Sequence, residues 1–293
     1  MKKSILLLLI TLGLLLSSCK SNSSENQNDA TIQSESLENI GSDTMVNLAL
    51  GWAEAYQTIH PEVLISVTGG GSGTGIASLI NGTADIANAS RSIKDEEIET
   101  AKTNDIEPVE FIVARDAIAV IVNPQNPISQ LSLEQVSDIY SGKINNWAEL
   151  GGEDRPIVRL SRETNSGTHV YFLEEVLRLG DSENTILFSR DTLLLPSSEG
   201  ITTEVRDNPN AIGYDGLGYV TPDVKVIAIS DVGSTNYVFP SYETVDDNSY
   251  PIARDLYMYT AGEPQGNIKQ YLGWILSEEA QKIVLDLGFI PVQ

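Results

Sequence analysis

Apolar and polar positions along this chain switch repeatedly between a two-residue period and a helical period. Short runs of β-branched residues predict strands, and apolar positions at helical spacing predict helices. This alternation favours an α/β protein with a mostly parallel sheet. In the first part of the chain, the pattern predicts strands over 37–44, 63–69 and 84–90, and helices over 45–59, 74–81 and 94–102.

A long apolar stretch at 109–124 interrupts this pattern and suits either a buried strand pair or a crossing between two lobes. Because about 255 ordered residues exceed the usual size of a single hydrophobic core, we expect two lobes. Beyond this stretch the predicted elements are a helix over 132–140, a strand, loop and helix over 156–177, strands over 211–220 and 250–260, and one or two helices over 265–288.

The first 20 residues have a pattern of their own. Lys2 and Lys3 precede an apolar run over 5–16, which is too short to span a membrane and predicts a signal peptide over 1–18. Cys19, the only cysteine of the sequence, follows in "LSSC", which resembles the lipobox of bacterial lipoproteins. We therefore expect a mature protein that begins at lipidated Cys19 and is anchored to the cell membrane outside the cytoplasm. A chance cysteine after a plain secretory signal is the alternative.

The polar residues that follow predict a flexible tether over 19–36. The formal net charge of the whole sequence is −23, and removal of residues 1–18, which hold two lysines and no acidic residue, changes it to −25. This excess repels nucleic acid and anionic lipid head groups, so we expect no nucleic-acid partner and contact with the membrane only through Cys19.

Three loops share one design, in which a short strand leads through Gly, Ser or Thr into the start of a helix. They are Gly41–Thr44, Gly71–Gly75 and Arg162–Thr168. The first N–H groups of a helix have no partner within it and attract anions, and hydroxyl groups beside them add donors. Each loop taken alone fits an ordinary helix cap. Three such loops, one with an arginine, favour a shared anion site.

Other chemistry finds little support in the sequence. A nucleotide-binding P-loop needs a lysine, and residues 66–93 contain none; the acidic residue of a dinucleotide fingerprint is also missing. His60 and His169 are far apart in the sequence, which has no HExxH zinc motif and no GxSxG nucleophile motif. The segment 115–117, "RDA", suits a strand edge. We therefore expect no enzyme activity, no metal and no cofactor.

An ordered set of motifs, "GSDT", "GGGSGTGI", "ADIANASR", "YSGKINNWAELGG", "SRETNSGT" and "AIGYDGLGY", stands behind the lipoprotein signal. The set resembles the substrate-binding proteins of high-affinity phosphate ABC importers over residues 37–293. The resemblance implies an α/β fold of the periplasmic-binding-protein type (type II), with two α/β lobes, a ligand cleft between them and hinge strands. Mapped here, one lobe holds 37–118 and 256–293, and the other holds 119–255.

The resemblance also implies which residues contact phosphate. Hydroxyl groups, backbone N–H groups and one arginine hold the anion in a closed cleft, where short-range dipoles outweigh the unfavourable net charge. The implied contacts are Asp43, Thr44, Ser72, Arg162, Ser166, Gly167 and Thr168, and the neighbouring Ser42, Gly73, Ser90 and Arg91 complete the candidate site.

One position departs from the family pattern. Well-known members have an aspartate after the third strand that accepts the proton of bound phosphate, and Arg91 stands at that place here. Arg91 is either a second cation of the site or the partner of a nearby acid. We hypothesise that Asp43 supplies the missing acceptor, because a carboxylate accepts a proton from phosphate and repels fully ionised sulfate.

Together these features predict a monomeric, extracytoplasmic phosphate-binding lipoprotein that delivers inorganic phosphate to the permease subunits of an ABC importer. The alternatives are a binding protein for another tetrahedral oxyanion, such as sulfate, molybdate or tungstate, and a surface phosphate sensor.

Overall fold

The computed structural model describes residues 35–292. The expected signal peptide over 1–18, lipidated Cys19 and most of the expected tether over 19–36 therefore lie outside the described residues. Strand β1 (Glu35–Gly41) includes the last two positions of that tether, so the folded body begins slightly earlier than expected. Among the described residues, no helix combines the length and the apolar character needed to cross a membrane.

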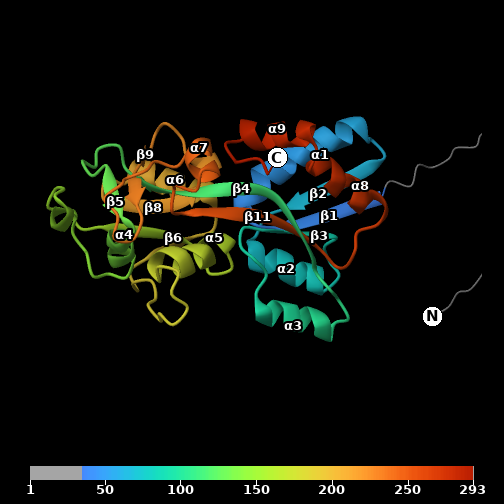
Figure 1. Ribbon diagram of the computed structural model, residues 1–293, viewed down its shortest axis with the longest axis horizontal. Helices are drawn as coiled ribbons and strands as arrows, with labels where there is room; N and C mark the ends of the chain where they lie inside the picture. The colour runs from blue at the N-terminus through green and yellow to red at the C-terminus, as the bar shows by residue number, and fades with distance from the viewer. Residues whose placement is uncertain (1–34, 293) are drawn as a thin grey trace, which may run out of the picture. The chain divides into compact units, whose positions relative to one another are not determined.

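A nine-stranded mixed sheet organises the fold, with the strand order β2-β1-β3-β11-β4-β8-β6-β7 and with β9 paired to β4 (Figure 1). Neighbouring strands are parallel at both ends of this order and antiparallel around β11 and β4. The prediction of a mostly parallel sheet is therefore wrong for the centre of the sheet. The remaining bounds are β2 Val63–Thr68, β3 Ile86–Ala89, β4 Val109–Val122, β6 Val158–Arg162, β7 Leu193–Leu195, β8 Ala211–Gly216, β9 Lys225–Val226 and β11 Ala253–Thr260; β5 (Gln130–Ser132) and β10 (Ala228–Ser230) form a second sheet.

The predicted helices are present, and the 265–288 region forms two of them. The α-helices are α1 Val46–Ile59, α2 Ser72–Ile80, α3 Asp95–Thr103, α4 Leu133–Tyr140, α5 Gly167–Tyr171, α6 Ser198–Asp207, α7 Tyr242–Asp246, α8 Gly266–Ile275 and α9 Glu278–Asp286. A π-helical turn (Phe172–Leu177) continues α5, and short 3-10 turns cover Asp43–Met45, Trp147–Leu150 and Leu217–Tyr219. No sequence pattern predicted α6 or α7.

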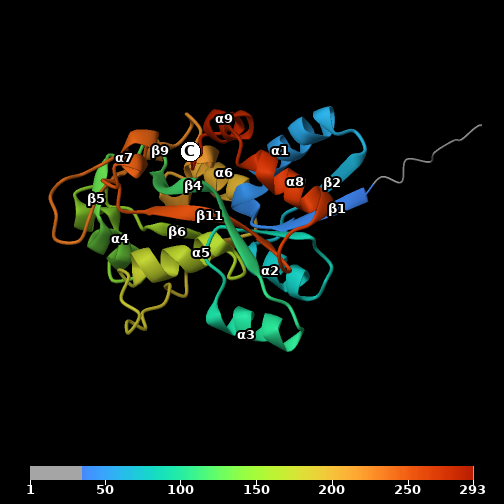
Figure 2. The ribbon, with the colours of Figure 1, turned by 45° about the vertical axis from the view of Figure 1, so that its right-hand side comes forward.

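Helices cover both faces of the sheet. Successive side chains of a strand point to opposite faces, and the buried strands carry apolar side chains on both. Around β1, β2 and β3, helices α1, α8 and α9 lie on one face and α2 and α3 on the other (Figures 1 and 2). Accordingly, Ile86 packs in a cluster with residues of α1 and α8, and the next residue, Ala87, packs with residues of α2 and α3. In β4, Val120 packs on the side of α4 and Ile121 on the side of α6.

Strands β4 and β11 lie side by side in the middle of the sheet and join its two ends (Figure 1). The apolar stretch 109–124 thus forms one long strand and not a strand pair, and its partner is the strand predicted over 250–260. The expectation for "RDA" is wrong for Asp116, which is fully buried in β4 directly opposite Arg254 of β11.

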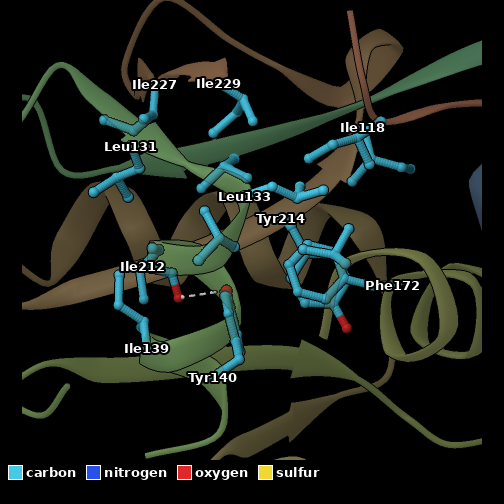
Figure 3. Packing of buried hydrophobic residues seen from close by; sticks show 14 of the residues in the cluster. Ile118, Leu131, Leu133, Ile139, Tyr140, Phe172, Ile212, Tyr214, Ile227 and Ile229 are labelled. Atoms are coloured by element: carbon cyan, nitrogen blue, oxygen red, sulfur yellow. Dashed lines mark hydrogen bonds between the residues drawn. The ribbon is translucent and has the colours of Figure 1, made fainter. Parts of the chain in front are cut away.

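A cluster of buried aromatic and aliphatic side chains fixes α5 against the sheet (Figure 3). Phe172, which follows α5, stacks on Tyr214 of β8 with ring centroids 3.5 Å apart. The hydroxyl of Tyr140 in α4 donates to the carbonyl oxygen of Ile212 at 3.4 Å, which ties α4 to the same strand. The loop that precedes α5 is therefore held by a rigid core.

Candidate functional site

The three loops singled out in the sequence each follow the carboxyl end of a strand. Gly41–Thr44 (first loop) begins at the last residue of β1, and Arg162–Thr168 (third loop) begins at the last residue of β6. The second loop, Gly71–Gly75 in the sequence, comes after β2 and is extended here to Gly69–Gly75. Ser90 and Arg91 follow β3, which is parallel to β1. Ligands of open α/β sheets bind at the carboxyl ends of parallel strands, so this edge is where a site is expected.

Five of the predicted hydroxyl groups meet at this edge as a buried cluster, made of Ser42, Thr44, Ser72, Ser90 and Thr168. The Ser42 hydroxyl donates to Ser90 Oγ at 2.8 Å, and the Ser90 N–H donates to Ser72 Oγ at 3.0 Å. The hydroxyl oxygens of Thr44 and Thr168 lie 2.7 Å apart and share a hydrogen bond. The hydroxyls thus bond to one another, and an anion placed among them would take over these bonds.

Gly167 brings the third loop close to this cluster. A Cβ atom at this position would lie 2.2 Å from Ser72 Oγ and 2.6 Å from Ser90 Oγ, well inside van der Waals contact. Only glycine allows this approach of backbone to hydroxyl groups.

Helix capping accounts for one of the three loops. Ser166 is the N-cap of α5, and its hydroxyl accepts from the N–H groups of Thr168 and His169. Ser42 precedes the 3-10 turn without a capping bond from its side chain, and the N-cap of α2 is Gly71. The hydroxyls of Ser42 and Ser72 are therefore not used as caps, which favours the interpretation as an anion site.

Arg162 is buried and faces the first loop, as expected for a shared anion site. Its Nη2 lies 3.0 Å from Asp43 Oδ2 and donates to the Pro196 carbonyl oxygen at 2.8 Å. Asp43 Oδ2 also accepts from the Ser198 N–H at 3.0 Å. The proposed proton acceptor thus already shares one oxygen with an arginine and a backbone N–H.

Ser198 and Asp215 belong to this network and were missed in the sequence. Arg162 Nη1 donates to Ser198 Oγ at 2.7 Å, and the Ser198 hydroxyl donates to Asp215 Oδ1 at 2.9 Å. Burial raises the pKa of Asp215 to about 6, although the positive charge of Arg162 opposes the shift. The motif "AIGYDGLGY" contains Asp215. An aspartate inside a segment predicted to be a strand was the sequence signal that could have indicated a site residue.

A second buried ion pair, Asp116 and Arg254, lies beside the cluster and was also missed. Arg254 Nη2 lies 2.9 Å from Asp116 Oδ2 and 3.0 Å from Thr168 Oγ1, and its Nη1 donates to the Ser90 carbonyl oxygen at 2.9 Å. Burial raises the pKa of Asp116, and the charge of Arg254 opposes this. Charged residues inside the two apolar stretches 109–124 and 250–260 were the available sequence signal.

Arg91 follows the second of its two expected roles, as the partner of an acid. Its Nη1 and Nη2 donate to the two carboxylate oxygens of Glu97 in α3 at 2.8 and 2.7 Å. Burial raises the pKa of Glu97, but the hydrogen bonds from Arg91 and from the Lys94 N–H outweigh burial and hold it below its ordinary value. The guanidinium of Arg91 is therefore engaged outside the hydroxyl cluster.

The second and third loops also contact each other directly. The N–H of Gly73 donates to the Asn165 carbonyl oxygen at 3.1 Å, and Asn165 Nδ2 donates to the Gly70 carbonyl oxygen at 2.7 Å. These bonds close the site on one side.

Comparison with known proteins agrees with this geometry. A family model described as "PBP superfamily domain" matches residues 24–279. The chain is 33% identical over 276 residues to the phosphate-binding protein PstS of Pseudomonas aeruginosa, covering 88% of this chain and 84% of that protein. It is 34% identical over 298 residues to the phosphate-binding protein PstS of Bacillus subtilis, covering 99% and 94% of the two chains.

Solved structures show the same relationship. A phosphate ABC transporter substrate-binding protein from Clostridium perfringens, solved with bound phosphate, has a TM-score of 0.79 and 34% identity, covering 88% of this chain and all of that one (100%). An ABC-type phosphate transport receptor from Vibrio cholerae has a TM-score of 0.69 and 29% identity, covering 87% and 99%. The chain therefore has the α/β fold of periplasmic binding proteins and belongs to the PBP superfamily and, within it, to the PstS family of phosphate-binding proteins.

Proposed function

We propose that this protein binds inorganic phosphate outside the cytoplasm and delivers it to the permease subunits of an ABC importer. The observation that carries the proposal is the buried cluster of five hydroxyl groups, with Arg162 beside it, at the strand edge where three loops meet. The names of the relatives, which are phosphate-binding proteins, support phosphate as the anion.

Phosphate would be held mainly by neutral donors. Hydroxyls of Thr44, Ser72 and Thr168, the N–H groups at the starts of α2 and α5, and the guanidinium of Arg162 surround the proposed seat. These groups lie in a dry environment, where fixed dipoles are worth more than in water. The site therefore needs no favourable field from a chain whose formal charge is −23.

We further propose the two lobes mapped from the sequence, 37–118 with 256–293 and 119–255. The clusters of buried apolar residues support this division, because most members of each cluster come from one of these sets. Since the first and second loops belong to one set and the third loop to the other, bending at β4 and β11 would admit and release the anion.

Calorimetric titration of the purified protein without residues 1–18 tests the proposal. We expect saturable phosphate binding at one site that persists in excess sulfate, molybdate or tungstate. Stronger binding of one of those anions would instead show that the protein is a binding protein for that oxyanion. We expect no hydrolysis of a generic phosphomonoester, and turnover would contradict the assignment as a binding protein.

Membrane attachment is a separate proposal because Cys19 lies outside the described residues. "LSSC" supports a lipidated protein on the outer side of the cell membrane, and we propose that this protein is a monomer. Metabolic labelling with palmitate should mark the wild-type protein and not Cys19→Ala. Equal labelling, or release of the wild type into the medium, would reject the anchor, and light scattering of the soluble form checks the monomer.

A further inference from the structure

Arg254 is the one arginine among the described residues whose hydrogen bonds reach both Ser90 and Thr168 of the hydroxyl cluster. It is 6% exposed and lies on the central strand β11, where Nε and Nη2 contact Asp116 Oδ2 at 3.3 and 2.9 Å. The same guanidinium donates to the carbonyl oxygen of Ser90 and to the hydroxyl oxygen of Thr168. It thus joins the carboxyl end of β3 to the first turn of α5.

Helix α5 is attached to β11 at a second residue as well. The guanidinium of Arg254 lies over the ring of Tyr171, 5.4 Å from its centroid, and the Tyr171 hydroxyl donates to the Ala253 carbonyl oxygen at 2.7 Å. Tyr171 is three residues after Thr168, so both face the same side of the helix. The position of the Thr168 hydroxyl is therefore set by β11 as well as by the third loop.

The hydrogen bond from Arg254 also restricts where the Thr168 proton points. A guanidinium only donates, so Thr168 Oγ1 must accept from it and must donate its own proton elsewhere. In the structure the other neighbour is Thr44 Oγ1 of the first loop, 2.7 Å away, and either hydroxyl can be the donor in that bond. An anion between the loops would receive the same proton.

We propose that Arg254 is a positioning residue of the anion site that acts through the Thr168 hydroxyl, fixing and polarising its O–H bond toward bound phosphate. This inference rests on the proposed function. Asp116 holds the guanidinium in place and balances its charge, so the pair contributes orientation rather than net charge. Because Arg254 lies on a strand, the orientation does not depend on a mobile loop.

A double-mutant cycle separates this role from that of a structural ion pair. Arg254→Lys keeps the charge, but one ammonium group cannot reach Asp116, Ser90 and Thr168 together, and Thr168→Val removes the hydroxyl at nearly constant volume. We expect Arg254→Lys to weaken phosphate binding about tenfold or more in the wild type, because a bond from a charged donor is lost. In the Thr168→Val background the same change should alter the dissociation constant by less than about twofold.

Arg159→Lys is the matched control. Arg159 is 1% exposed in β6 and donates to the carbonyl oxygens of Ile139 and Ile144, away from the three loops. We expect a comparable fall in melting temperature with unchanged phosphate affinity. Equal effects of Arg254→Lys in both backgrounds, or an affinity loss in Arg159→Lys, would overturn the proposal.

A second pair of variants and the phosphate affinity of the wild type separate a failure of this proposal from a failure of folding or of the proposed function. If Arg254→Lys does not fold, the cycle is repeated with Arg254→Gln combined with Asp116→Asn, which leaves no unpaired buried charge, and the same non-additivity with Thr168→Val is expected. A wild type that binds no phosphate would reject the proposed function itself. A wild type that binds phosphate with an additive cycle would reject only the role of Arg254.

Discussion

Single residues carry most of the chemistry of this site. Asp43 best illustrates why the sequence alone could not decide which residue accepts the phosphate proton. Its position in the first loop suggested a free acceptor for the phosphate proton. In the structure, Oδ2 is shared by Arg162 and the Ser198 N–H, and a Cβ atom added at Gly69 would lie 3.2 Å from Oδ1. The carboxylate therefore neutralises part of Arg162, and any bond to phosphate must use its remaining capacity.

Asp43→Asn should reduce the discrimination between phosphate and sulfate. The amide keeps an acceptor for the Ser198 N–H but loses the charge that repels sulfate and balances Arg162. We expect the ratio of the sulfate to the phosphate dissociation constant to fall about tenfold or more, as measured by calorimetry. Asp191→Asn is the control, since Asp191 pairs with buried Arg159 at 3.0 Å outside the loops. An unchanged ratio in Asp43→Asn would show that proton acceptance lies elsewhere.

At the scale of elements, the site depends on two helix starts that meet face to face. Helix α2 begins at Ser72, two residues before the predicted start, because Gly70 and Gly71 adopt positive φ values of 123° and 96° and complete the turn within the second loop. Helix α5 begins at Gly167, which contacts Ser72 and Ser90. The helix starts are thus close enough to share one small anion.

Gly167→Ala should separate these helix starts and weaken phosphate binding. The new methyl group would lie 2.2 Å from Ser72 Oγ, and such overpacking costs about 1–3 kcal/mol, which corresponds to roughly 5- to 150-fold in affinity. Gly273→Ala in α8 is the control, because no heavy atom lies within 4 Å of the added group. There we expect unchanged affinity and about 0.5–1 kcal/mol of added stability. Full affinity in Gly167→Ala would mean that bound phosphate does not need this contact.

Elements with a long periodic pattern were predictable, and contacts between distant segments were not. The strands at 63–69 and 250–260 and the helix at 132–140 appeared with small shifts at their ends. Helix α6 was missed because only a few of its positions are apolar, yet its first residue, Ser198, bonds to Arg162 and Asp215. Asp116 and Arg254 are 138 positions apart, and no local pattern pairs them.

For the whole molecule, the loops of the site come from both sides of the central strands, so we expect binding to be linked to the proposed closure. The third loop follows β6, and the first and second loops follow β1 and β2 at the other end of the strand order. Among the described contacts between these loops, those of Asn165 involve no hydroxyl of the buried cluster. They can therefore hold the loops together without competing for the anion.

Asn165→Ala should make phosphate leave faster. The substitution removes the bonds from Nδ2 to the Gly70 carbonyl oxygen and, at 3.4 Å, to Thr74 Oγ1, while the backbone bond from Gly73 to residue 165 remains. Because only exposed side-chain hydrogen bonds, one of them long, are lost, we expect the dissociation rate to rise about three- to tenfold. Stopped-flow displacement of phosphate measures this rate, and the association rate should change little, because the loops are still apart when the anion enters.

Asn184→Ala is the matched control for this measurement. Asn184 makes a similar side-chain bond, to the Arg178 carbonyl oxygen at 3.3 Å, within its own turn and outside the three loops. Its substitution should leave both rates unchanged. If Asn165→Ala instead slows association and leaves dissociation unchanged, Asn165 prepares the open loops for entry and does not hold the closed form.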